Sequence, residues 1–304
     1  MRVVFMGTPD FAVASLRQLV SDGYEVVGVF TQPDKPGNRK KMTPPPVKLY
    51  AQEQGLAVYQ PTSMKDGTAL AILQELRPEL IVVAAYGKIL PVDILELPKY
   101  GCINVHSSIL PKYRGAAPIN WVILDGEEET GVTIMYMEKG LDTGDIISVA
   151  RTAISPDEDA QELTQRLALL GADLLGKTIP TLVDGTVQPQ KQDDSKSCYA
   201  SMLSRELSPI DWTRSAAQIR NQIRGLMPWP CASTTVDGLN VKIFRAEFGN
   251  KTGKAPGSMT AVKRGLEVAC GDGMTLLITE LQAEGGKRMA AADYLRGHPL
   301  KTSD

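Results

Sequence analysis

The sequence predicts an α/β protein, with a doubly wound, mostly parallel sheet followed by a small carboxyl-terminal β-barrel. Short apolar strands alternate with amphipathic helices through the first half of the chain, and this alternation implies a parallel sheet with helices on both faces. Beyond a polar stretch near residue 190, short strand-like runs recur about every ten residues, as in small barrels. The length of 304 residues is sufficient for two domains.

The alternation begins with an apolar strand at residues 2–6, which Gly7 ends. Pro9 or Asp10 can open the helix that follows, because its apolar side chains recur with a helical period. Folds of this kind bind ligands at the carboxyl ends of their strands. The further expected strands are 25–31, 57–59, 80–85, 102–105, 131–137 and 146–150, and the expected helices are 11–20, 47–54, 68–76, 116–124 and 159–182.

The apolar pattern fades between residues 187 and 209, where Gln, Pro, Asp, Ser and Lys dominate. This composition is typical of a linker. We therefore expect a first domain at 1–189, a linker at 190–207 and a second domain at 208–304. In the second domain the sequence predicts a helix at 216–223 and strands at 232–236, 239–246, 257–262, 266–270 and 274–281.

Composition argues against several classes of protein. No run approaches the roughly 18 apolar residues that a membrane span needs, so no membrane partner is expected. Four scattered cysteines without a C-x-x-C pair argue against a disulfide framework or a metal site, and favour a reducing cytoplasm. Residues 7–12 lack the G-x-G-x-x-G pattern of dinucleotide sites, and Pro9 removes an amide donor there.

Charge is unevenly distributed along the chain. Residues 1–207 contain 20 Lys and Arg against 26 Asp and Glu, whereas residues 208–304 contain 13 against 9. A basic second domain on an acidic first domain fits a polyanionic partner held at particular places. Chance asymmetry on solvated surfaces remains the alternative.

Asn104 and His106 are the first candidates for catalysis. They are two residues apart at the end of an apolar strand, so their side chains point to the same face. His106 is one of two histidines in the chain. An amide and an imidazole side by side can stabilise one developing oxyanion and move one proton. The alternative is that both only anchor the following loop.

Asp142 lies in a glycine-flanked turn, 140–145, between two expected strands. Taken alone, such a turn is typically held by its own carboxylates. A carboxylate brought beside His106 would orient the imidazole ring and favour its charged form. Asn104, His106 and Asp142 would then form a set of groups for acyl transfer that requires no serine or cysteine nucleophile.

Two further segments are candidates for binding. The connection at 32–48 is long, and it contains Arg39, Lys40 and Lys41 in succession. It is either a solvated loop or a loop that orders against phosphates. Tyr86 and Gly87 follow an expected strand, where a flat ring can pass close to the backbone; a plain turn is the alternative.

These motifs resemble the folate-dependent formyltransferases. The pattern N-x-H-x-S-x-L-P-x-Y-R-G at 104–115 is followed by G-x-D-x-G-D-I at 140–146, with further similarity at 6–11, 224–230 and 286–289. The resemblance spans essentially the whole chain. It implies a Rossmann-like catalytic domain and an oligonucleotide-binding (OB) type of barrel. It also implies a pocket for 10-formyltetrahydrofolate lined by Tyr86, Gly87, Ser108, Ile109, Leu110 and Pro111, where Ile109 replaces the commoner leucine.

The resemblance further implies the activity and the partners. The members most similar to this chain transfer a formyl group to methionine on initiator methionyl-tRNA, and their loop corresponding to 32–48 enters the acceptor arm. Arg39, Lys40 and Lys41 are therefore expected to bind tRNA, together with some of Lys242, Arg245, Lys251, Lys254, Lys287 and Arg288. The expected protein is a cytoplasmic monomer that uses no metal.

The attacking group in this reaction is the free amine of methionine, which is already nucleophilic. The enzyme therefore has only to position the reactants and stabilise the developing charge. Asn104 and His106 would donate to the oxyanion, and Asp142 would hold His106. Two alternatives remain: a formyltransferase acting on another acceptor such as a sugar-nucleotide amine, or an RNA-binding protein without catalysis.

Overall fold

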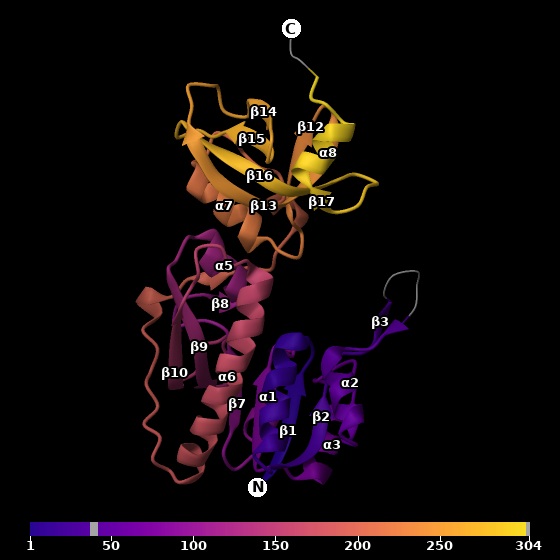
Figure 1. Ribbon diagram of the computed structural model, residues 1–304. Helices are drawn as coiled ribbons and strands as arrows, with labels where there is room; N and C mark the ends of the chain where they lie inside the picture. Colours follow the sequence, from indigo (N-terminus) through magenta and orange to yellow (C-terminus); the bar gives the residue numbers. More distant parts are fainter. Residues whose placement is uncertain (37–41, 302–304) are drawn as a thin grey trace. The chain divides into compact units, whose positions relative to one another are not determined.

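The computed structural model describes residues 1–36 and 42–301 (Figure 1). The chain divides into two compact units, which are described separately. The first comprises Met1–Pro118, Glu129–Ala153 and Thr164–Ser201, and the second comprises Ile119–Glu128, Ile154–Leu163 and Met202–Asp304.

Seven of the described strands form the sheet of the first unit. In spatial order they are β10 (Ile146–Ala153), β9 (Glu129–Tyr136), β7 (Cys102–His106), β6 (Leu80–Ala84), β1 (Arg2–Gly7), β2 (Glu25–Phe30) and β5 (Val58–Tyr59). Neighbours from β5 to β7 are parallel, whereas β9 and β10 join as antiparallel strands. The predicted α/β fold class is confirmed.

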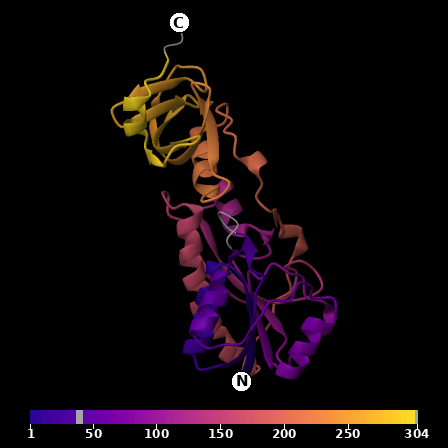
Figure 2. The same cartoon turned by 90° about the vertical axis from the view of Figure 1, so that its right-hand side faces the viewer.

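Helices cover both faces of this sheet, as Figures 1 and 2 show. On one face, α3 (Thr68–Leu76) and α4 (Val92–Leu95) pack on a core that includes Val4, Met6 and Tyr86. On the other lie α1 (Asp10–Ser21) and residues 164–183 of α6 (Ala160–Val183). A Cβ at Gly171 of α6 would lie 2.9 Å from a Val105 methyl group of β7, so glycine permits this close packing.

The long connection after β2 is tied together at its base. Two-residue strands β3 (Lys35–Pro36) and β4 (Met42–Thr43) pair antiparallel, and α2 (Pro46–Glu53) follows. The ammonium group of Lys48 donates to both carboxylate oxygens of Asp34, at 2.9 and 2.8 Å. Arg39, Lys40 and Lys41 lie outside the described residues.

Residues 190–201 are in contact with the rest of the first unit. Here β11 (Tyr199–Ala200) pairs in parallel with β8 (Arg114–Gly115), and a short 3₁₀ helix, η2 (Asp194–Lys196), precedes it. The contacts in this segment are largely backbone and polar hydrogen bonds. Its low apolar content therefore does not mean that the segment is free of the first unit.

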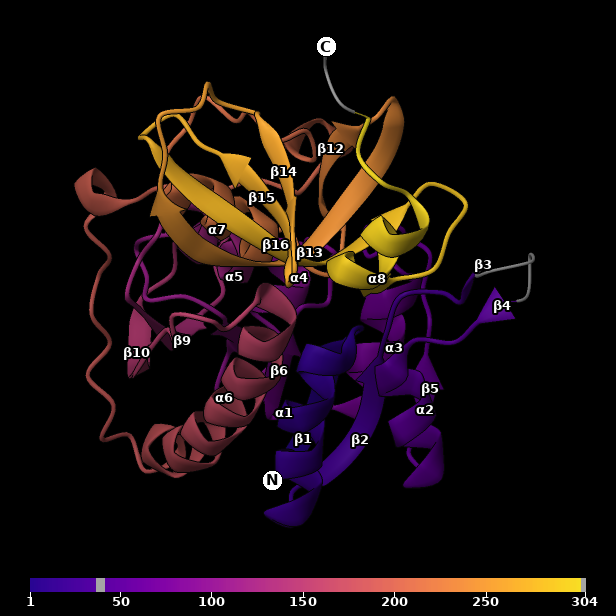
Figure 3. The same ribbon diagram turned by 45° about the horizontal axis from the view of Figure 1, so that its top comes forward.

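The second unit is built on an antiparallel sheet (Figure 3). Its hydrogen-bonded path is β12 (Ala232–Val236), β13 (Leu239–Lys251), β16 (Met274–Ala283), β15 (Gly265–Ala269) and β14 (Met259–Val262), with β17 (Met289–Ala290) beside β16. Register shifts between β13 and β16 mark bulges, which bend strands. The core contains apolar residues of the sheet, of α7 (Ala216–Gly225) and of α8 (Ala291–Gly297). The other short elements are α5 (Pro118–Leu124) and the 3₁₀ helix η3 (Arg205–Leu207).

Helix α7 is anchored by two arginines. Arg220 is 9% exposed, and its guanidinium donates to the Pro156 carbonyl at 2.8 Å and to that of Ala246 at 3.2 Å, and pairs with Asp157. Arg224 donates to the Glu158 carbonyl at 2.9 Å, and desolvation lowers its pKa. These contacts fasten residues 155–158 to α7. Within the described residues, no helix has the length and apolar character needed to cross a membrane.

Candidate active site

The carboxyl end of β7 positions Asn104 and His106. This strand pairs in parallel with β6 and antiparallel with β9, so its backbone is fixed on both edges. Cys102, two residues before Asn104, belongs to the core on the α3 and α4 face, and burial raises the pKa of its thiol to about 12. The period of two along a strand then places Asn104 and His106 on that same face.

The loop after β7 is held against β9. The Thr133 hydroxyl donates to the Ser108 carbonyl at 2.7 Å and accepts from the Leu110 amide at 3.1 Å. The Ser108 hydroxyl donates to the Lys112 carbonyl at 2.7 Å. These bonds give the loop a defined path and bring the Tyr113 carbonyl to 3.0 Å from His106 Nε2.

Asp142 lies between the two β7 side chains and the backbone of β8. Its Oδ2 atom is 3.7 Å from His106 Nδ1 and accepts from the Gly115 amide at 2.8 Å. Its Oδ1 atom is 3.5 Å from Asn104 Nδ2. The predicted meeting of Asn104, His106 and Asp142 is therefore observed in the structure. The His106 and Asp142 side chains are only 6% and 11% exposed.

The Tyr113 carbonyl determines how His106 can act. A carbonyl oxygen only accepts hydrogen bonds, so His106 Nε2 must donate this one. The nitrogen that faces Asp142 is then Nδ1, which carries a hydrogen only when the imidazole is charged. Nδ1 is therefore the ring nitrogen of His106 that can gain or lose a proton while the bond to Tyr113 is kept.

The turn that carries Asp142 depends on its glycines. Asp142 has a φ of 53°, in the left-handed region. A Cβ at Gly144 would lie 1.9 Å from the Tyr136 carbonyl oxygen, so the turn cannot pass β9 with any other residue there. The same turn is held from the other side by Gln192, whose amide donates to the carbonyls of Asp142 and Gly144.

The six residues expected to line a folate pocket differ in what they present. Tyr86 is 1% exposed, its hydroxyl donates to the Met64 sulfur at 3.3 Å, and burial raises the pKa of this hydroxyl. Ser108 and Leu110 are also buried. Gly87 is exposed, and Ile109 and Pro111 are partly exposed. Only these last three present surface to a ligand.

Three contacts at this site were not foreseen from the sequence: the Tyr113 carbonyl, the Gly115 amide and the Gln192 side chain. Two of them are backbone groups, which the amino-acid type does not announce. Gln192 lies in a polar run where nothing distinguishes it from its neighbours. Its exposure distinguishes it in the structure: it is partly buried in an otherwise exposed stretch.

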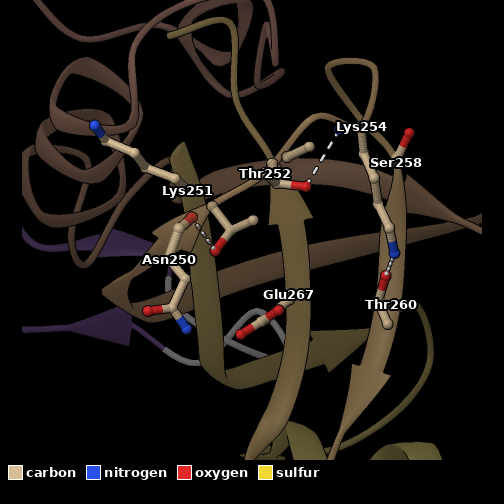
Figure 4. Close-up of a pocket in the computed structure, with 9 residues that line it drawn as sticks. Asn250, Lys251, Thr252, Lys254, Ser258, Thr260 and Glu267 are labelled. Atoms are coloured by element: carbon tan, nitrogen blue, oxygen red, sulfur yellow. Dashed lines mark hydrogen bonds between the residues drawn. The ribbon is translucent and has the colours of Figure 1, made fainter. Parts of the chain in front are cut away.

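A pocket of about 110 Å³ in the second unit is the alternative place for a ligand (Figure 4). It is lined by Lys251, Lys254, Thr260, Glu267 and other polar residues. The Lys254 ammonium donates to the Thr260 hydroxyl at 2.6 Å, and Lys251 points away from it. The two ammonium groups do not converge, so the pocket is not built as an anion site. No cluster of three or more potential metal ligands occurs among the described residues.

Comparison with known proteins shows what this chain is similar to. Residues 1–179 match the formyl transferase family, and residues 202–299 match the formyl transferase carboxyl-terminal domain. A curated methionyl-tRNA formyltransferase of Citrifermentans bemidjiense is 50% identical over 303 residues, which cover 99% of this chain and 95% of that protein. One from Caldanaerobacter subterraneus subsp. tengcongensis is 52% identical over 306 residues, covering 99% and 98%.

A solved structure shares the fold. It is the N-formyltransferase of Helicobacter canadensis, crystallised with folinic acid and dTDP-3-aminofucose. The TM-score is 0.70 at 22% identity, covering 91% of this chain and 98% of that chain.

Proposed function

The chain belongs to the methionyl-tRNA formyltransferase family, and we propose that it transfers the formyl group of 10-formyltetrahydrofolate to the amino group of methionine on initiator tRNA. The product is N-formylmethionyl-tRNA for translation initiation. The observation that carries the proposal is the meeting of Asn104, His106 and Asp142 at one end of β7. It occurs in a chain about half identical, over its full length, to curated members of that family.

The catalytic roles follow from the donors and acceptors of the three side chains. When bound, the folate supplies the formyl group as an electrophilic carbon attached to nitrogen. Asn104 Nδ2 donates to the formyl oxygen as negative charge develops there. Charged His106 donates through Nδ1 and then protonates the departing nitrogen, while Asp142 takes the amine's proton through water. The new carbon–nitrogen bond thus replaces the old one with no net change in protons.

The charge of Asp142 makes this arrangement effective. Its carboxylate faces the nitrogen of His106 that carries the mobile proton, in surroundings that are largely closed to solvent. Electrostatic interactions are stronger in such surroundings than in water. The Gly115 amide donates to Oδ2 of the same carboxylate, whereas Asn104 contacts Oδ1. The proposed active form is a monomer.

The folate is assigned to the edge of the sheet where the segments after the neighbouring strands β6 and β7 carry Gly87, Ile109 and Pro111. Gly87 has a φ of 75° and carries no side chain, and the two other residues offer partly exposed apolar surface. Such surfaces suit a flat heterocycle. Tyr86, Ser108 and Leu110 support this edge from within the core.

The tRNA is assigned to the basic residues of the chain. Arg39, Lys40 and Lys41 form one group. In the second unit, Arg245 and Arg288 both pair with Glu280, and Lys254 donates to Thr260. Lys242, Lys251 and Lys287 are exposed and have no recorded partner in the described part of the chain. These three are the better phosphate contacts of the second unit.

The proposal treats 1–189 as the catalytic domain, 190–207 as the connecting segment and 208–304 as the OB-like tRNA-binding domain.

A cytoplasmic location is part of the same proposal. The four cysteines all lie within the described residues and are free, as suits a reducing compartment.

The experiment that tests the function combines the purified protein with methionine-charged initiator tRNA and 10-formyltetrahydrofolate. We expect N-formylmethionine after deacylation of the tRNA. If no N-formylmethionine forms but a sugar-nucleotide amine is formylated instead, the protein is a sugar-nucleotide formyltransferase.

Reversing the charges of Arg39, Lys40 and Lys41 should raise KM for tRNA. Unchanged activity at moderate salt would remove these residues from the tRNA site.

A further inference from the structure

Gln192 occupies an unusual position in the segment that follows α6. Of residues 191–199, all of which the structure describes, Gln192 alone is not exposed. Its amide nitrogen donates to the Asp142 carbonyl at 2.8 Å and to the Gly144 carbonyl at 2.7 Å. Both amide hydrogens are therefore used on the turn that carries the proposed catalytic carboxylate.

The other end of the same amide is also engaged. Gln192 Oε1 accepts from Arg114 Nε at 3.0 Å and from Arg114 Nη2 at 2.7 Å. Arg114 is largely buried, at 11% exposure, and its guanidinium also pairs with Asp194 at 2.8 Å. A guanidinium only donates and carbonyls only accept, so the orientation of the Gln192 amide is determined by its partners.

Gln192 thereby joins the two segments that meet at Asp142. One is the turn itself, where Asp142 adopts the left-handed backbone conformation. The other is β8, where Arg114 precedes Gly115, whose amide donates to the Asp142 carboxylate at 2.8 Å. If either segment shifts, the distance from the carboxylate to His106 Nδ1 changes with it. A misplacement of about 1 Å at a reacting group can cost roughly a hundredfold in rate.

We propose that Gln192 is a positioning residue that sets Asp142 against His106 and Asn104. The inference rests on the proposed function, since Asp142 is assigned its role there. Gln192 touches neither substrate in this assignment. It acts through Asp142, so its loss should lower kcat and leave both KM values nearly unchanged.

Two variants separate the role of the Gln192 amide oxygen from that of its amide nitrogen. Gln192→Ala removes both groups. Gln192→Glu keeps an oxygen acceptor for Arg114 and removes the donors to Asp142 and Gly144. We expect both variants to lower kcat roughly 10- to 100-fold, with KM for each substrate within about twofold of the parent. A Gln192→Glu variant at the parent rate would show that the donors are dispensable and would overturn the proposal.

Gln190→Ala is the matched control. Gln190 lies two residues away, is exposed, and pairs with Ile146 through its backbone. It should keep the parent kcat. A similar loss of rate in Gln190→Ala and Gln192→Ala would mean that the segment matters only as structure, which contradicts the proposal.

A double-mutant cycle with Asp142→Ala distinguishes positioning from general damage. If Gln192 acts through Asp142, adding Gln192→Ala to Asp142→Ala should change the residual kcat by less than about twofold. A further loss as large as in the parent background would overturn the proposal.

Hydrogen exchange gives a readout that does not depend on the reaction. Amide exchange in residues 140–145 should be faster in Gln192→Ala than in the parent and in Gln190→Ala. Unchanged exchange would reject the positioning role even if the enzyme is active. If the parent protein forms no formylmethionine, the proposed function fails, while this exchange measurement still decides whether Gln192 holds the turn.

Discussion

The Asn104 amide nitrogen carries two hydrogens, and its contact with Asp142 Oδ1 at 3.5 Å uses one of them. The other is available to a formyl oxygen. We expect Asn104→Ala to lower kcat by roughly 10²- to 10³-fold, or about 2.7–4 kcal/mol of barrier, as for other oxyanion donors. Steady-state kinetics with both substrates measures this. The exposed Asn240 provides the control Asn240→Ala, and an Asn104→Ala enzyme at the parent rate would remove Asn104 from the mechanism.

Gly87 tests the assigned folate edge at the same scale. A Cβ at Gly87 would lie 2.4 Å from Gln32 Nε2, and its φ of 75° is strained for other residues. Gly87→Ala should therefore displace Gln32 and raise KM for the formyl donor about tenfold, equivalent to about 1.4 kcal/mol. Gly67 has a φ of 84° and nothing within 4 Å, so Gly67→Ala shares the strain without the crowding. Equal KM values in the two variants would argue against the folate assignment.

At the scale of elements, the connection between β2 and α2 depends on charge at its base. Hydrogen bonds from Lys48 and then Gln60 lower the pKa of Asp34. A lowered pKa in the folded state stabilises the protein above the unfolded-state pKa, and this contribution is lost as the pH falls through the folded-state value. The stabilisation should therefore disappear below the ordinary aspartate value of 3.8.

Asp34→Asn makes this prediction measurable. Its Tm should be lower than that of the parent at neutral pH, and the two Tm values should converge as the pH falls below the ordinary range for aspartate. Asp66→Asn is a suitable comparison, because Asp66 caps a backbone amide and has no lysine partner among the described residues. A gap between parent and Asp34→Asn that is constant across the pH range would show that the Asp34 charge does not matter.

The elements that could be predicted from the sequence are those with a periodic apolar pattern. The strands that became β1, β6 and β7 and the long helix α6 carry this pattern over enough residues to be recognised. Helix α4 has four residues and β8 and β11 have two each, too few for a period to appear. The meeting of Asn104, His106 and Asp142 was predictable because their residue types are chemically distinctive and lie in recognisable motifs. Gln192 was not, because its role depends on partners 48–78 positions away along the chain.

At the scale of the whole molecule, the uneven distribution of charge along the chain bears on which basic side chains bind the phosphates of tRNA. Residues 208–304 carry 13 basic against 9 acidic side chains. Several basic groups there are already satisfied: Arg288 makes a two-bond pair with Glu280, and Arg264 makes one with Glu247. Arginines held in this way lose existing partners if they bind phosphate, whereas exposed lysines without a recorded partner do not.

We therefore expect Lys242→Glu, Lys251→Glu and Lys287→Glu each to raise KM for tRNA at low salt, with KM for the formyl donor unchanged. A true phosphate contact releases counterions on binding, so each loss should also reduce the slope of log affinity against log salt by about 1. Lys177→Glu, an exposed lysine on α6, is the control for charge reversal outside residues 208–304. Equal effects at Lys177 and at the three lysines would mean that only the net charge matters, and that tRNA is not held at particular places on the second unit.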